Sequence, residues 1–124
     1  MRLKIISKAV GDVFAELTNE NPLTIDAIFS KLPIEGKANI WGDEIYFSIP
    51  VEVGAENQSE VVQLGDIAYW PPGKAFCIFF GPTPASWDNE IRPASPVNVV
   101  GRIVENPRIF KLVGGGDKIM LKRV

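Results

Sequence analysis

Residues 65–80 read Gly-Asp-Ile-Ala-Tyr-Trp-Pro-Pro-Gly-Lys-Ala-Phe-Cys-Ile-Phe-Phe. Within this stretch, residues 67–70 predict one strand. Residues 75–80 predict a second, whose continuous apolar character is typical of a strand buried on both faces. Between them, two prolines that donate no backbone hydrogen bond and one glycine predict a tight connection. The stretch therefore favours a β-rich fold built from short strands.

Outside this stretch, strand and turn patterns continue along most of the chain. Further strands are predicted at residues 2–7, 13–17, 38–41, 44–48, 61–62, 97–104 and 118–124. Many short strands with few helices favour a barrel or a sandwich over a parallel α/β sheet. No repeat, low-complexity segment or linker interrupts the pattern, so residues 1–124 are predicted to form a single domain.

One helix is clearly indicated. Asn21 is a suitable N-cap and Pro22 is tolerated at the first helical position, while Pro33 ends the helix at Leu32. The apolar residues near helical spacing, expected on one face, are Leu23, Ala27, Ile28 and Leu32. A short helical turn is predicted at residues 107–112.

Composition excludes several classes of partner and chemistry. The net charge is −2 and no basic block is present, so nucleic acid is not expected as a partner. The longest apolar run has six residues (75–80) and the N-terminus lacks a signal-peptide core, which predicts a cytoplasmic protein without a membrane partner. Histidine is absent, which excludes His-containing metal sites and Ser-His or Cys-His nucleophiles. Cys77 lies in an apolar run and is predicted to be a buried structural residue; no metal or cofactor is expected.

Aromatic residues beside the predicted turns suggest a concave site. Trp41, Tyr46, Tyr69 and Trp70 are amphipathic and typical of a pocket at the mouth of a barrel, although they can equally plug its ends as core. Glu44 shares a strand face with Tyr46, so its carboxylate either enters such a pocket or is solvated. Asp43 and Asp66 each follow a turn glycine and are interpreted as structural.

The chain resembles a small prokaryotic family of cyclophilin-like proteins of unassigned function. The resemblance covers almost the whole chain, and the Tyr-Trp-Pro-Pro-Gly run at residues 69–73 is its most specific part. It implies a mostly β fold, a closed eight-stranded cyclophilin-like barrel with one or two short helices capping its open ends. Ordinary prolyl isomerases of the cyclophilin type carry a catalytic arginine in a Phe-His-Arg segment. The corresponding stretch here, residues 36–41, has neither arginine nor histidine.

The sequence and the resemblance suggest three alternative functions. The first is a module that binds a peptide or small ligand, as a monomer or weak homodimer. The predicted lining of its site is Trp41, Glu44, Tyr46, Tyr69, Trp70, Phe79, Phe80, Arg92 and Asn98. The second is a peptidyl-prolyl isomerase with a divergent site, in which Arg92 or the Asn98 amide supplies the hydrogen-bond donor. The third rests on fold analogy: a component of an amide-hydrolysing assembly with Glu44 or Asp66 as base.

Overall fold

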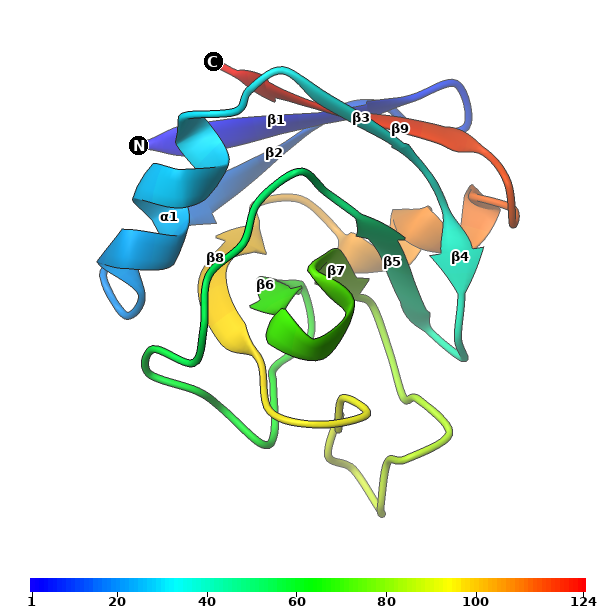
Figure 1. The fold of residues 1–124 in the computed structure, drawn as a ribbon. Coiled ribbons are helices and arrows are strands. Elements are labelled where there is room, and N and C mark those ends of the chain that lie inside the picture. Colours follow the sequence, from blue (N-terminus) through cyan, green and yellow to red (C-terminus); the bar gives the residue numbers. More distant parts are fainter.

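The computed structural model describes residues 1–124 as one antiparallel sheet of nine strands in the order β3-β9-β1-β2-β8-β6-β7-β5-β4 (Figure 1). Three short helices join them: α1 (Pro22–Phe29) and the 3-10 helices η1 (Pro71–Gly73) and η2 (Pro107–Leu112). The strands are β1 (Arg2–Ser7), β2 (Gly11–Leu17), β3 (Ile34–Lys37), β4 (Asn39–Ile40), β5 (Glu44–Ser48), β6 (Asp66–Trp70), β7 (Ala75–Phe79), β8 (Asn98–Ile103) and β9 (Lys118–Arg123).

The sheet curls into a nearly closed barrel, because its two edge strands are successive pieces of one segment. β3 pairs with β9 and β4 pairs with β5, and only Ala38 separates β3 from β4. Ala38 donates its N–H to the Asp117 carbonyl and accepts from the Gly116 N–H, which bends the segment from one partner to the other. The mostly β barrel predicted from the sequence is confirmed, with nine strands instead of eight because this segment is interrupted.

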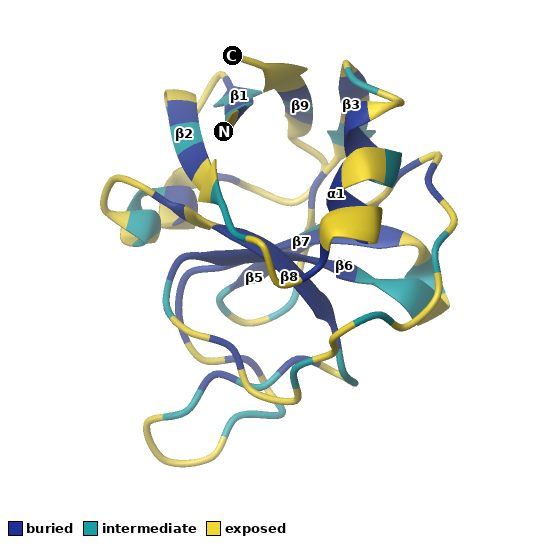
Figure 2. Cartoon of the chain, turned by 90° about the vertical axis from the view of Figure 1, so that its left-hand side faces the viewer, coloured by how far each residue is buried: buried dark blue, intermediate teal, exposed yellow.

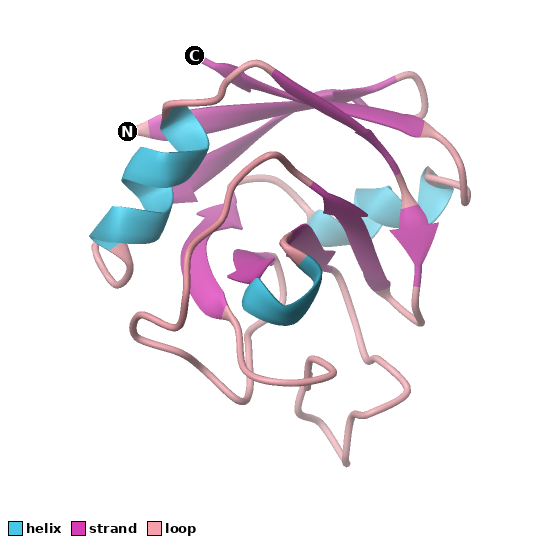
Figure 3. Cartoon of the chain, viewed as in Figure 1, coloured by secondary structure: helices cyan, strands magenta, loops and turns pink.

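Strand alternation divides the apolar side chains into two cores. Inside the barrel, Ile67 and Tyr69 of β6 join Phe76 and Ile78 of β7 in a cluster of 24 buried residues. The residues between them, including Ala68 and Cys77, point outward into a second cluster of eight. Val62, Ile91 and Val97 join that outer cluster from the connecting segments, which are drawn in pink in Figure 3. β7 is therefore buried along its whole length, as its apolar run predicts (Figure 2).

Helices α1 and η2 lie at different ends of the barrel (Figure 1), and each contributes apolar side chains to its core. Phe110 of η2 is fully buried, with its ring centroid 6.4 Å from that of Phe80. From α1, the residues that enter the core are Ile25, Ile28 and Phe29. The predicted apolar face was wrong at Leu23, which is 69% exposed because the helix turns its Ile25 side inward. The predicted end of the helix at Leu32 was also wrong, since α1 ends at Phe29.

The capping of α1 also differs from the sequence-based expectation. Asn21 is the N-cap residue, but its side chain bonds the Val99 carbonyl and the Asn57 N–H instead of the helix. Glu56, from the loop before β6, accepts the N–H groups of Leu23 and Thr24, each at 3.1 Å. Residues 61–62, predicted as a strand, contribute a single bridge from Val62 to Ile91. No helix of the chain has the length and apolarity needed to cross a membrane.

Candidate functional site

A pocket of about 260 Å³ opens on the outer face of the barrel, beside the second core. Its walls come from the β4–β5 hairpin, the end of β6 and the segment before β8. The lining residues are Trp41, Glu44, Tyr46, Trp70, Pro93, Ala94 and Val97. Four residues predicted from the sequence as ligand-binding, namely the two tryptophans with Glu44 and Tyr46, are thus brought together.

The hairpin turn places Trp41 beside Glu44. The Trp41 N–H donates to the Glu44 carbonyl at 2.9 Å, and the Glu44 N–H returns a bond to the Trp41 carbonyl at 3.2 Å. Gly42, at the first central position, has φ +60°, as a type II′ hairpin turn requires. Because directly opposite residues of an antiparallel pair share a face, the indole and the carboxylate both project outward into the pocket.

Close backbone contacts hold this hairpin in place. Asp43 donates its N–H to the Pro82 carbonyl and accepts from the Phe80 N–H, both at 2.9 Å. A Cβ on Gly81 would lie 2.3 Å from the Asp43 carboxylate, and a Cβ on Gly42 would lie 3.0 Å from the Pro82 carbonyl oxygen. Glycine is therefore needed on both sides of the contact, and the position of Glu44 is fixed by residues far from it in sequence.

The Trp70 ring is fixed from two directions. Its indole Nε1–H donates to the Ser95 Oγ at 2.7 Å. The backbone of Gly73 packs so close that a Cβ there would lie 2.5 Å from the ring. Lys74 then adopts φ +48° and returns the chain into β7. The Trp-Pro-Pro-Gly sequence thus forms a tight turn whose last residue leaves room for the indole.

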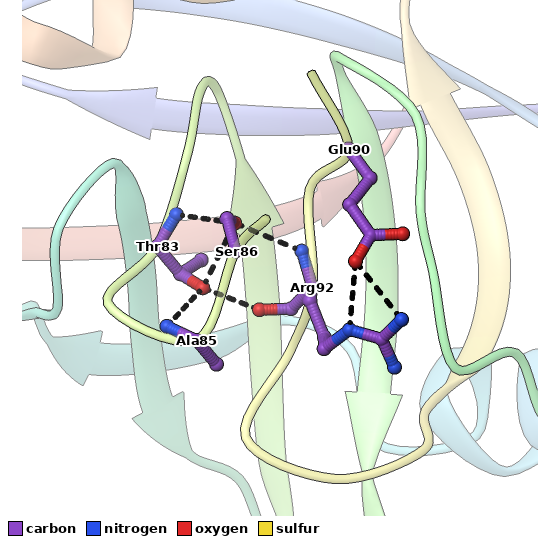
Figure 4. A network of polar contacts seen from close by, with 5 residues as sticks. All are labelled: Thr83, Ala85, Ser86, Glu90 and Arg92. Carbon is purple, nitrogen blue, oxygen red and sulfur yellow. Dashed lines mark hydrogen bonds and ion pairs between the residues drawn. The ribbon is translucent and has the colours of Figure 1, made fainter. Parts of the chain in front are cut away.

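The wall formed by Pro93 and Ala94 is supported by a polar network in the preceding loop (Figure 4). Thr83 accepts the Ala85 N–H at 3.2 Å and donates its hydroxyl to the Arg92 carbonyl. Ser86 accepts the N–H groups of Thr83 at 2.9 Å and of Arg92 at 3.1 Å. These bonds tie the two ends of the loop together immediately before the wall begins.

Glu44 is the only ionisable carboxyl in the pocket lining, and it is 5% exposed. It takes part in none of the ion pairs of the structure. Burial raises the pKa of Glu44 to about 7, and a hydrogen bond with the Cys77 side chain partly opposes this rise. Burial and the neighbouring Glu44 raise the pKa of Cys77 well above its usual range, so this thiol is not a ready nucleophile.

Five of the predicted lining residues lie outside this pocket. Phe79 is fully buried in the outer core, whereas Phe80 and Tyr69 belong to the barrel core. There, the Tyr69 hydroxyl donates to the Val51 carbonyl at 2.7 Å. Asn98 is fully buried, and its amide bonds Thr24 Oγ1, the Gly54 carbonyl and the Glu56 N–H. Arg92 is absent from the lining and pairs with Glu90 at 2.9 Å (Figure 4).

Asp66, the alternative base considered from the sequence, is also a structural residue. Its carboxylate accepts the Gln63 N–H at 2.8 Å and pairs with Arg102 at 2.9 Å. It therefore closes the turn before β6, as the Gly-Asp pattern predicts.

Sequence reasoning did not single out Pro93, Ala94 and Val97 as individual lining residues. They follow an irregular segment whose prolines give no periodic signal, so only the folded loop shows that they face Trp41 and Trp70. Their place in a proline-rich segment next to a strand was the one available signal.

Comparison with known proteins agrees with this architecture. The family model described as Cyclophilin-like matches residues 1–122. The solution structure of the hypothetical protein AF2241 from Archaeoglobus fulgidus is 50% identical, with a TM-score of 0.86, and the match covers 100% of this chain and 95% of that one. The structure of McbB in complex with tryptophan is 15% identical, with a TM-score of 0.75, over 98% of this chain and 44% of that one, and it shows a likeness of fold alone. None of the curated proteins compared with the chain matches it. Since the family model spans nearly every residue, this chain belongs to the Cyclophilin-like family.

Proposed function

We propose that the chain is a binding domain whose pocket takes a small ligand or one side chain of a peptide. The observation that carries this proposal is the buried carboxyl of Glu44 at a pocket walled by Trp41, Tyr46 and Trp70. Apolar and aromatic walls with a few placed polar groups are the general pattern of ligand sites. A volume of about 260 Å³ suits a ligand the size of one side chain or one small ring system.

The pocket is organised before any ligand arrives. Trp70 is held by Ser95 and by the backbone of Gly73, and the hairpin carrying Trp41 and Glu44 is held by backbone bonds to Pro82 and Phe80. Groups that are already ordered lose little conformational entropy when a ligand binds. This order in the unliganded pocket favours recognition.

Two polar groups of the lining remain available to a ligand. The indole N–H of Trp41 and the hydroxyl of Tyr46 make no side-chain hydrogen bond within the protein, whereas the Trp70 N–H is bonded to Ser95. Together with Glu44 they offer donors and an acceptor around one small volume.

Catalysis of prolyl isomerisation is supported less well by this geometry. It requires a hydrogen-bond donor beside an apolar pocket, and the two candidates were Arg92 and Asn98. The Arg92 guanidinium pairs with Glu90, and the Asn98 amide hydrogens go to Thr24 and Gly54. Neither group lines the pocket.

Chemical-shift mapping on the isotope-labelled protein tests the proposal. The probes are indole, L-tryptophan, choline and 3,3-dimethyl-1-butanol, chosen as aromatic, amino-acid, cationic and neutral aliphatic occupants; L-tryptophan also follows the ligand held by McbB. We expect at least one probe to shift the resonances of Trp41, Glu44 and Trp70 in a saturable manner.

The three tryptophans supply matched variants. Trp41→Ala and Trp70→Ala should each weaken binding of the active probe by ~10-fold or more, because each removes a wall of the pocket. Trp87→Ala is the control, since Trp87 is 72% exposed and lies outside the lining. Equal affinities for all three variants and the wild type would show that the site is assigned wrongly, and no saturable shift with any probe would remove the proposed function.

A further inference from the structure

The pocket lining has an acidic side chain but no basic one among its seven residues. The basic side chains of neighbouring segments are engaged elsewhere: Arg92 pairs with Glu90, Lys74 with Glu52 at 3.5 Å and Lys111 with Asp43 at 3.9 Å. An anionic ligand would therefore meet no opposite charge in the pocket and would be repelled by Glu44.

The aromatic walls of the pocket also favour a positively charged ligand. Trp41, Tyr46 and Trp70 are three of the seven lining residues, and the rings of tryptophan and tyrosine attract cations through the negative potential of their faces. Aromatic rings grouped around a carboxylate form the type of site that recognises organic ammonium ions.

Resting on the proposed function, we infer that the ligand of this pocket carries a positively charged nitrogen, as an alkylated ammonium group, with Glu44 as its counter-ion. The cation supplies the opposite charge that the buried carboxylate lacks in the protein. A carboxylate buried without a partner is unfavourable, so ligand binding and ionisation of Glu44 stabilise each other.

This coupling makes binding depend on pH. Besides Glu44, the titratable groups that face it are Tyr46 from its own strand β5 and Cys77 from β7; β6 and residues 93–97 contribute none to the lining. The pKa of the buried Cys77 is raised well above its usual range, so the change between pH 5.5 and pH 8 is assigned to Glu44. A cation that binds only the ionised form should bind up to roughly 30-fold more tightly at pH 8 than at pH 5.5.

The test compares choline with 3,3-dimethyl-1-butanol, in which a carbon atom replaces the charged nitrogen and the shape is kept. Binding is measured by chemical-shift titration at pH 5.5 and pH 8. At pH 8 we expect choline to bind at least ~10-fold more tightly than the alcohol, and the preference to shrink at pH 5.5. Glu44→Gln should abolish most of the preference, while Glu35→Gln, on the exposed face of β3, should retain it.

The outcomes separate the two proposals. If the alcohol binds as tightly as choline at pH 8, or if Glu44→Gln keeps the preference, the pocket binds ligands but the inference of a cation is wrong. If none of the probes shifts the pocket resonances, the binding function itself fails. Saturable choline binding with the stated pH dependence supports both.

Discussion

Glu44 shows how a single side chain acquires properties that its neighbours in sequence do not predict. On β5 it alternates with Ile45 and Phe47, which enter the barrel core, so it points outward with Tyr46. Outward residues of a sheet are usually solvated, but here the segment before β8 and the two tryptophans cover it. Its burial, rather than any neighbouring charge, raises its pKa to about 7.

The first prediction concerns the stability conferred by this residue. Because burial raises the pKa of Glu44 from 4.5 to about 7, the folded state favours the protonated form. Its stabilising contribution is complete below pH 4.5 and is lost as the pH rises through 7. Glutamine stays neutral, so Glu44→Gln should match the wild type at pH 4 and exceed it at pH 8 by up to about 3 kcal/mol.

Urea unfolding of the wild type and the variant at pH 4 and pH 8 measures this difference. Glu35→Gln serves as the control, because Glu35 is 51% exposed and pairs only with Lys118 at the surface. A Glu44→Gln effect of the same size at both pH values would contradict the burial of an ionisable carboxyl.

Among the elements, helix α1 depends on groups supplied by other segments. The Glu56 carboxylate accepts the first helix N–H groups, and the buried Asn98 of β8 bonds both Thr24 of the helix and the backbone of residues 54 and 56. Partial burial raises the pKa of Glu56, but its bonds to Leu23 and Thr24 outweigh this and lower it overall. The helix, its capping loop and β8 therefore form one polar unit.

The second prediction tests this unit. Asn98→Ala removes a fully buried amide and leaves Thr24, Gly54 and the Glu56 N–H without their partner. Unsatisfied buried polar groups are costly, so we expect the free energy of unfolding to fall by about 2–4 kcal/mol. Asn89→Ala, at the exposed tip of the long loop, should change it by less than about 0.5 kcal/mol.

Denaturant unfolding of both variants measures these values, and choline titration of Asn98→Ala adds a second readout. Since Asn98 is absent from the pocket lining, its variant should keep the affinity of the wild type under conditions where it is folded. A folded Asn98→Ala protein that has lost binding would place Asn98 in the site after all.

At the scale of the whole molecule, a cyclophilin-like barrel carries a pocket that neither Arg92 nor Asn98 lines. The third prediction is that a short peptide containing Ala-Pro, mixed with a catalytic amount of the protein, keeps the uncatalysed exchange time of tens to hundreds of seconds. Two-dimensional exchange NMR measures the rate. Exchange on the sub-second scale would show that a donor is present, and loss of that exchange in Arg92→Ala or in Trp41→Ala would identify it.

Much of this architecture is contained in local sequence. The strand pattern in residues 67–70, the apolar run in residues 75–80 and the prolines at residues 71–72 predict two strands and their connection, and the structure has them as β6, β7 and η1. The hairpin at Gly42 and Asp43, which pairs Trp41 with Glu44, follows from the same local rules. The sequence by itself thus determined most of the strands, the tight turns and the shared face of Glu44 and Tyr46, but not β3.

Only the tertiary structure decided which of these residues meet at one site. Three predicted lining residues contact other parts of the protein instead of the pocket. The Asn98 side chain bonds Thr24, Phe79 packs in the outer core, and Arg92 pairs with Glu90. Conversely, Pro93 and Ala94 reach the pocket because Thr83 and Ser86 close the loop before them. The periodicity of a sequence predicts from which face of its strand a side chain projects. The burial of that side chain, its pKa and its presence in a pocket depend on the other segments that pack against that face.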